Sequence, residues 1–360
     1  MVIALFVAGI VLLVLGADLL VRGAASFAAS LGVSPLIIGL TVVAIGTSSP
    51  EIAVSLQAAF NGQGAITLGN IVGSNIANIM LILGVAAMFG PLPVDRQIFR
   101  RDLPVMIGAS LLTLLLALDR VLSRTDGAIL LIGLIAYLWV MWPRDAHSDQ
   151  LHPNRSHHHH WRVRVLQVAM MVGGLALLVL GANWLVNGAV TFATWFGVSE
   201  LIIGLTIVAV GTSLPEIATS VIAGFRGERD IAVGNVIGSN VLNLLFVLAL
   251  TMLLSPQPIA VPEETVWLDL PVMVGATLIC VPIFITRRMV SQREGSLLLV
   301  YYLSYTLYLI LSASGSEKLP VYSTVVGLLL IPLTAVLLVV RALRWLGEER
   351  RQRTVAHTVE

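Results

Sequence analysis

The chain has 360 residues, of which 57% are hydrophobic and only 11% are charged, and its mean hydropathy is +0.94. Soluble globular domains carry about a quarter charged residues, so this composition excludes an ordinary soluble protein and indicates one that lies in lipid. A net charge of +1 with scattered basic residues gives no indication of nucleic-acid binding, so we expect no nucleic acid as a partner, and the single Cys280 excludes a disulfide within the chain.

Eleven apolar stretches are long enough to cross a bilayer, which takes roughly 20 mostly apolar residues. In chain order they cover 2–22, 34–60, 66–89, 102–119, 126–142, 164–186, 199–224, 231–254, 268–286, 295–314 and 321–341. The first stretch lacks the basic residues that open a secretory signal peptide, and its tripeptide at 15–17 (LGA) returns at 180–182. We therefore expect it to be a transmembrane helix of the mature chain.

The basic residues predict how the chain is oriented. With the N-terminus outside, 18 of the 21 Lys and Arg residues fall on the cytoplasmic side, and only Arg120, Arg124 and Lys318 fall outside. Cytoplasmic loops of membrane proteins are enriched in Lys and Arg, so we predict an outside N-terminus and an inside C-terminus. The preference for Arg over Lys and the lack of a targeting signal suit a multi-pass protein of a prokaryotic plasma membrane.

The two halves of the chain repeat each other at an offset of 165 residues. The segment 39–51, GLTVVAIGTSSPE, returns at 204–216 as GLTIVAVGTSLPE, with ten of thirteen positions identical. The same offset maps GNIVGSNIAN at 69–78 onto GNVIGSNVLN at 234–243, and DLPVM at 102–106 returns at 269–273. The chain is therefore a duplication of about five helices with one helix added.

Because five is an odd number, the two copies must enter the membrane from opposite sides, as in the inverted repeats of secondary transporters. We predict a first repeat over 1–142, a cytoplasmic linker loop over 143–163, a second repeat over 164–314, and an extra helix with a basic tail over 315–360. The predicted fold class is thus an all-α integral membrane protein with about 11 transmembrane helices. We assign no function to the eleventh.

Two acidic residues, Glu51 and Glu216, lie deep inside apolar spans. An ionisable group at that depth costs several kcal/mol, so it is a functional candidate by default, and neither span holds a Lys or Arg to pair with it. Hydroxyl residues precede each Glu by three and four positions, which places them on the same helix face. They are Thr47 and Ser48 in the first repeat, and Thr212 and Ser213 in the second.

A proline stands directly before each Glu, at positions 50 and 215. Proline cannot donate a backbone hydrogen bond, so it should break the helix and free the carbonyls of Gly46 and Gly211. Free carbonyls beside carboxylates and hydroxyls form an all-oxygen pocket, which suits a hard cation such as calcium.

A second polar stripe recurs every four residues on the following helix of each repeat. It consists of Asn70, Ser74 and Asn78 in the first repeat and of Asn235, Ser239 and Asn243 in the second. Glycines beside the stripe allow a close approach of helices. Hydrogen bonding between helices without ion contact is the alternative role for any one of these residues.

The segments 39–51 and 204–216 resemble the alpha-1 and alpha-2 repeats of the cation/calcium antiporter superfamily, closest to the sodium/calcium exchangers, over the whole ten-helix core. The resemblance implies that Glu51 and Glu216 together bind one calcium, with the carbonyls of Thr47 and Thr212. It also implies sodium ligands and central groups: the carbonyls of Ala44 and Ala209, the hydroxyls of Thr47, Thr212, Ser48, Ser213, Ser74 and Ser239, and the side chains of Asn78 and Asn243.

The expected function is therefore exchange of sodium for calcium by alternating access at a midplane site. The transported ions and membrane lipid are the expected partners, with no cofactor, no enzymatic activity and no obligatory protein partner. Potassium-dependent relatives carry Asp where this chain has Asn243, which argues against potassium co-transport. Three alternatives remain: a calcium/proton antiporter, a passive cation channel, and, more remotely, an intramembrane enzyme, although the predicted spans contain no His.

Overall fold

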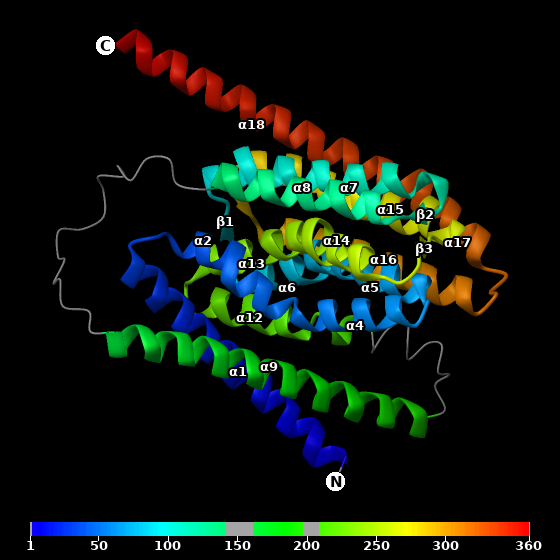
Figure 1. The fold of residues 1–360 in the computed structure, drawn as a ribbon. Coiled ribbons are helices and arrows are strands. Elements are labelled where there is room, and N and C mark those ends of the chain that lie inside the picture. The colour runs from blue at the N-terminus through cyan, green and yellow to red at the C-terminus, as the bar shows by residue number, and fades with distance from the viewer. Residues whose placement is uncertain (1, 142–160, 197–208, 360) are drawn as a thin grey trace.

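The computed structural model describes residues 2–141, 161–196 and 209–359, and the side chains as far as Trp345. Within these ranges the chain is almost entirely helical (Figure 1). Among the described residues, nine helices are long and apolar enough to cross a membrane, and a bent pair of helices supplies a tenth span. The all-α membrane fold expected from the sequence is confirmed. The predicted span 199–224 and the predicted linker lie partly outside the described residues.

The first repeat contains α1 (Val2–Leu31), α2 (Pro35–Ile38), η1 (Gly39–Val43), α3 (Ala44–Thr47), α4 (Ser49–Phe60), α5 (Gly64–Ala77), η2 (Asn78–Ile82), α6 (Leu83–Met88), η3 (Ile98–Asp102), α7 (Leu103–Leu116), η4 (Ala117–Asp119) and α8 (Arg124–Met141). Apart from η4, a 3₁₀ turn, the η segments are π-helical.

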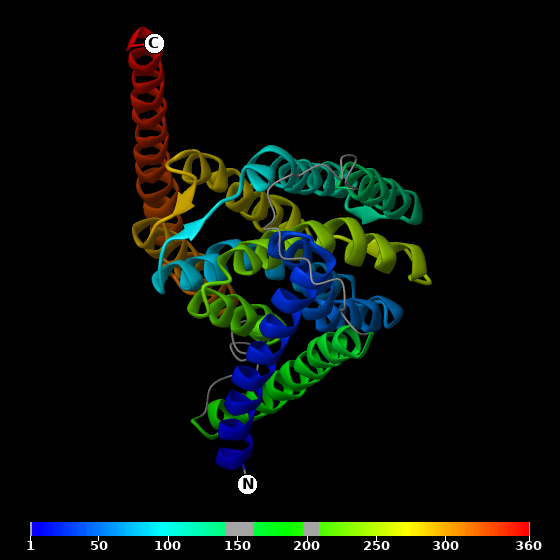
Figure 2. The same cartoon turned by 90° about the vertical axis from the view of Figure 1, so that its left-hand side faces the viewer.

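The second repeat contains α9 (Trp161–Trp195), α11 (Ala209–Gly211), α12 (Leu214–Phe225), α13 (Arg229–Leu242), η6 (Asn243–Leu248), α14 (Ala249–Leu254), η7 (Thr265–Asp269), α15 (Leu270–Ile285) and α16 (Gln292–Ala313). The chain ends with α17 (Leu319–Val325), η8 (Val326–Leu330) and α18 (Ile331–Val359), which lies at the edge of the molecule (Figures 1 and 2).

The long helices α1 and α9 open the two repeats and pack against each other (Figure 2). They touch through glycines: a Cβ at Gly174 would lie 2.7 Å from the Gly16 carbonyl oxygen, and one at Gly181 would lie 2.8 Å from that of Gly9. Small residues let helix backbones approach in this way inside membranes. The LGA tripeptides of the two repeats therefore serve a helix contact.

Helix α1 continues well past the predicted end of the first span at residue 22. Close to that predicted end, Asp18 pairs with Arg22 one turn later at 3.0 Å and also with Arg226, the residue that directly follows α12. These ion pairs tie α1 to the second repeat at the rim of the helix bundle.

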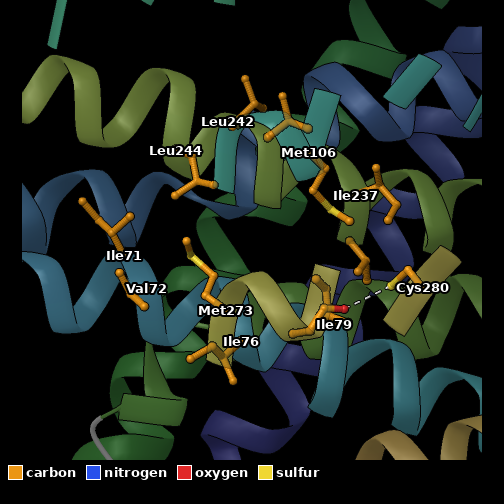
Figure 3. Close-up of a cluster of buried hydrophobic side chains, with 14 of the residues drawn as sticks. Ile71, Val72, Ile76, Ile79, Met106, Ile237, Leu242, Leu244, Met273 and Cys280 are labelled. Atoms are coloured by element: carbon orange, nitrogen blue, oxygen red, sulfur yellow. Dashed lines mark hydrogen bonds between the residues drawn. The ribbon is translucent and has the colours of Figure 1, made fainter. Parts of the chain in front are cut away.

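The main core lies between α5, α7, α13 and α15, where both repeats contribute equivalent side chains (Figure 3). Met106 and Met273, which share a position in the repeated DLPVM motif, are both fully buried. Cys280 is buried too, and its thiol faces the carbonyl of Ala276 one turn earlier. It packs between helices and does not face lipid.

Two short antiparallel strand pairs join the repeats at their loops. Strand β1 (Leu92–Pro93) pairs with β4 (Met289–Val290), and β2 (Val121–Leu122) pairs with β3 (Ile259–Ala260). Strands β1 and β4 lie in the loops after the third and the ninth predicted spans. Strands β2 and β3 lie in the loops after the fourth and the eighth. The predicted topology places the two loops of each pair on the same membrane face, so the strand pairing agrees with inverted repeats.

Asp102 and Asp269 could be helix caps by sequence, since each begins the repeated DLPVM motif. The structure contradicts this interpretation, because neither side chain caps a helix. Asp102 ends the π-helical turn η3, which continues into α7, and Asp269 ends η7, which continues into α15. Each instead accepts a hydrogen bond from a tyrosine hydroxyl, Tyr137 at 3.1 Å and Tyr305 at 2.8 Å.

Candidate ion-binding site

The spans that carry the two glutamates break just before them. Helix α3 ends at Thr47 and α4 begins at Ser49, with a bend of 43° between the halves of this span. The backbone leaves helical geometry at Ser48 (ψ 7°) and at the equivalent Ser213 (ψ 6°). The proline in the first turn of α4 and of α12 explains both breaks. As predicted, each Glu therefore lies in the first turn of a new helix.

The free carbonyl expected at Gly46 is not free. The hydroxyl of Ser49 donates a hydrogen bond to it at 2.7 Å and replaces the amide that Pro50 lacks. The second repeat has Leu214 in place of Ser49, so the repeats differ at this point.

Glu51 and Glu216 are each only 1% exposed, and each accepts a hydrogen bond from the other repeat. The Glu51 Oε1 atom accepts from Ser213 at 3.4 Å and from Ser74 at 3.3 Å, and the Glu216 Oε1 atom accepts from Ser48 at 3.1 Å. The Ser48 hydroxyl also lies 3.2 Å from that of Ser239.

These contacts place both carboxylates and all four predicted serines in one buried cluster. Oε2 of each carboxylate has no hydrogen-bond partner among the described residues.

Two threonine–asparagine pairs flank the carboxylates. The hydroxyl of Thr47 donates to Asn235 Oδ1 at 3.1 Å, and that of Thr212 donates to Asn70 Oδ1 at 3.4 Å. Each pair joins the broken helix of one repeat to the polar helix of the other. The predicted asparagine stripe therefore orients the predicted threonines.

The same asparagines also hold the backbone beside the glutamates. Asn70 Nδ2 donates to the Glu51 carbonyl at 3.2 Å and to Ser55 Oγ at 2.9 Å. The sequence prediction did not include Ser55 or its equivalent Ser220, which accepts from Asn235 at 3.1 Å. Their signal was present, because both serines follow a glutamate by four residues and obey the 165-residue offset.

Asn78 and Asn243 lie at the ends of the polar helices, where each begins a π-helical turn. Both side chains are 1% exposed, and neither the amide nitrogen nor the amide oxygen of either has a partner among the described residues. π-Helical turns inside α-helices occur frequently at functional sites. A buried amide without partners indicates a group that a ligand satisfies, since buried polar atoms are otherwise hydrogen-bonded.

The two alanines expected to offer carbonyls begin short helical turns before each break. Ala44 is buried, and its carbonyl already accepts from Ser48 N at 3.0 Å and from Thr47 Oγ1 at 3.4 Å. In the second repeat, Ser213 N donates to Val210 at 3.1 Å, one position after Ala209. The backbone around the two breaks is thus similar but not identical.

The cluster offers only oxygen ligands and amides. Among the described residues, no basic side chain pairs with either glutamate, and no three His, Cys, Asp or Glu residues gather as a metal centre of that kind. Two uncompensated carboxylates surrounded by hydroxyls match the preference of calcium and other hard cations for oxygen. Such a charge pair inside a membrane marks an ion pathway.

Inverted repeats, broken helices and buried carboxylates at their junction define a multi-pass membrane transporter. Comparison with known proteins agrees: the sodium/calcium exchanger protein family model matches residues 1–142 and 166–311. The chain belongs to this family and is a cation/calcium antiporter by class.

Individual proteins support the assignment. The chain is 42% identical over 265 residues to the Escherichia coli inner membrane protein YrbG, covering 71% of this chain and 81% of YrbG. It is 33% identical over 338 residues to the Methanosarcina acetivorans sodium/calcium exchanger MaX1, covering 84% and 96%. These relatives agree with the expected location in a prokaryotic plasma membrane.

The fold is similar to the solved structure of the sodium-calcium exchanger NCX_Mj soaked with 10 mM Na⁺ and zero Ca²⁺. The TM-score is 0.73 at 32% identity, and the match covers 87% of this chain and 99% of NCX_Mj.

Proposed function

We propose that this chain exchanges sodium for calcium across the membrane by alternating access. The observation that carries the proposal is the junction of the repeats, where Glu51 and Glu216 lie buried with serines from both repeats and with no basic partner among the described residues. In the part of the chain that the structure describes, each carboxylate keeps one oxygen without a hydrogen bond, which makes it ready to bind a cation. The similarity to NCX_Mj and MaX1, both named sodium/calcium exchangers, supports this choice of ions.

In this proposal, calcium binds between Glu51 and Glu216, with the carbonyls of Thr47 and Thr212. Two carboxylates neutralise one calcium ion, and hard cations favour such oxygen ligands. Sodium ions use the surrounding groups, and Asn78 and Asn243 line the centre. The sodium ligands are the carbonyls of Ala44 and Ala209 and the hydroxyls of Thr47, Thr212, Ser48, Ser213, Ser74 and Ser239.

Shared ligands couple the two fluxes. Calcium and sodium exclude one another because both need the same carboxylates. Without a cation, two like charges would face each other in a medium of low dielectric constant, where their repulsion is strong. The protein therefore converts readily between its outward-facing and inward-facing states only when ions are bound. This requirement couples the sodium and calcium fluxes and prevents uncoupled passage of either ion.

Calcium uptake into sealed liposomes tests the proposal. Purified protein is reconstituted, the vesicles are loaded with sodium, and radioactive calcium uptake is measured after dilution into sodium-free medium. We expect uptake that depends on the sodium gradient and disappears in Glu51→Gln. The matched control is Glu317→Gln, which removes an acid that is exposed and far along the chain from the junction.

Other gradients separate the remaining functions. Uptake that ignores sodium but follows an imposed pH gradient would replace the proposal with calcium/proton exchange. Downhill calcium entry that needs no counter-ion would indicate a channel. Absence of uptake under every gradient, from protein that remains folded, would mean that another ion is carried.

A further inference from the structure

An apolar cavity of about 720 Å³ lies where the added C-terminal helices meet the second repeat. We call it the seam cavity, because it follows the line along which α15 and α18 pack. Its wall includes Trp267, Gly275 and Pro282 on one side and Val326 and Leu338 on the other. The family match ends at residue 311, so this cavity depends on helices outside the exchanger core.

Three of the four tyrosines that border the seam cavity direct their hydroxyls into hydrogen bonds. Tyr305 donates to Asp269 at 2.8 Å, Tyr322 donates to the Ser304 carbonyl at 2.9 Å, and Tyr301 is bonded to Thr334. With these polar atoms satisfied, the cavity offers mainly hydrocarbon and aromatic surface. A polar solute would lose hydration there without gaining partners, whereas a hydrocarbon chain would not.

A basic hollow continues the same seam. It is lined by Thr286 and Arg287, which follow α15, and by Arg341, Arg344 and Trp345 of α18. Thr286 comes four residues after Pro282, and Arg341 comes three after Leu338, so the hollow begins about one helical turn beyond the cavity. Both helices therefore lead from an apolar chamber to a cluster of three guanidinium groups.

The charge of this hollow is only partly compensated. Arg341 forms an ion pair with Glu294 at 3.1 Å, and the Arg287 guanidinium lies 5.8 Å from the centre of the Trp345 ring. Within the described residues, neither Arg287 nor Arg344 has an acidic partner closer than 4 Å. Among the described side chains, two positive charges therefore remain, on the membrane face that the sequence predicts to be cytoplasmic.

We propose that the seam binds a phospholipid with a negatively charged headgroup. One acyl chain occupies the seam cavity, and the phosphate contacts Arg287 and Arg344. The helical segment from Trp267 in η7 to Pro282 in α15 rises about 22 Å, more than the roughly 15 Å of hydrocarbon in one leaflet, so the cavity has the length for an acyl chain. Basic pockets between transmembrane helices on the cytoplasmic side bind anionic headgroups in other membrane proteins.

This lipid is placed to affect exchange. Met80 also lines the seam cavity, and it belongs to η2, the π-helical turn that begins at Asn78. An acyl chain in the cavity would hold that turn from outside the ion cluster. The site itself, however, stands independently of which ions the protein exchanges.

Lipid binding to the purified full-length protein in detergent tests this inference by native mass spectrometry. The probes are phosphatidylglycerol and phosphatidylcholine with identical oleoyl chains. We expect tighter binding of phosphatidylglycerol, and an increase of about tenfold or more in its half-saturating concentration in R287Q/R344Q. The control R162Q/R164Q removes two exposed arginines at the start of α9 and should bind like the unmodified protein.

A cavity variant tests the acyl chain separately. A Cβ at Gly275 would meet no atom within 4 Å, so Gly275→Phe should fold while filling the chamber. We expect it to bind less of both lipids. The proposal would be overturned if the unmodified protein bound the two lipids equally well. It would also be overturned if R287Q/R344Q and the control R162Q/R164Q lost phosphatidylglycerol binding to the same extent. If inorganic phosphate alone displaced the bound lipid, the seam would be a site for free anions. If the protein formed dimers without lipid, the seam would be a contact with a second copy of the chain.

Discussion

The two halves of the candidate ion site use the same residues but hold them differently. Around Glu51, one carboxylate oxygen accepts from two serines, Ser74 and Ser213, at 3.3 and 3.4 Å. Around Glu216, one oxygen accepts from Ser48 alone at 3.1 Å, and the second serine, Ser239, contacts Ser48. Duplication has thus preserved the ligand types, while the geometry of the halves has diverged.

This difference shows that identical motifs need not give identical ion affinities. A carboxylate with two hydroxyl donors has less of its charge available to a cation than one with a single donor. Substitutions at matched positions in the two repeats can therefore separate what the halves share from what distinguishes them.

The largest effect on calcium binding is expected from the feature that both halves share, the buried glutamate. Glu51→Gln and Glu216→Gln should each weaken calcium binding by about a hundredfold or more, because a buried contact with a charged group is worth roughly 3 kcal/mol. Equilibrium binding of radioactive calcium to purified protein measures this loss. If either variant bound calcium like the unmodified protein, that half would not contribute a charged ligand.

A second substitution tests how the repeats are held together. A Cβ at Gly238 would lie 2.6 Å from the Leu40 carbonyl oxygen, so Gly238→Ala must push α13 away from η1. Overpacking of this kind costs about 1–3 kcal/mol. We expect a lower thermal-unfolding midpoint and slower exchange. Gly108→Ala is the control, since a Cβ there meets no atom within 4 Å; an equal drop in both variants would contradict the close contact.

The serines distinguish the two halves directly. Ser48→Ala removes contacts at 3.1 and 3.2 Å, whereas Ser213→Ala removes two at 3.4 Å. Because one hydrogen bond contributes about 1 kcal/mol, each variant should raise the half-saturating sodium concentration by about fivefold, with the larger change in Ser48→Ala. Sodium titration of calcium uptake compares them. The reverse order would show that the contact lengths do not set the affinities.

The sequence predicted most of the site because the repeat marks it twice. Glu51 and Glu216 are unusual in apolar spans, and Pro50 and Pro215 locate the helix breaks that the structure shows. Each of these signals depends only on neighbouring residues in the chain, so it can be recognised in a single sequence.

Other features could not be predicted, because they depend on contacts between distant segments. Helix α1 continues past Arg22 to Leu31, and its Asp18 pairs with Arg226, which directly follows α12 in the other repeat. The strand pair β1–β4 and the bond from Thr47 to Asn235 likewise join residues far apart in sequence. The π-helical turns at Asn78 and Asn243 have no known signal in residue type.

The smallest expected effect comes from a local hydrogen bond that Leu214 cannot make in the second repeat. Ser49→Ala removes the hydrogen bond to the Gly46 carbonyl, which then lacks both this donor and the amide that Pro50 cannot supply. One neutral hydrogen bond contributes about 1 kcal/mol or less, so exchange should slow by less than about fivefold. Sodium-driven calcium uptake measures the change.

The matched control for this variant is Ser30→Ala. Ser30 makes the same kind of bond in α1, to the Phe27 carbonyl three residues earlier at 2.8 Å, away from the helix breaks. A slower rate in Ser49→Ala alone would show that the first break needs a local donor, which the second break, with Leu214, does without. Equal rates in the two variants would mean that the break at Ser48 depends on Pro50 and on the contacts between the repeats, and not on the Ser49 hydroxyl.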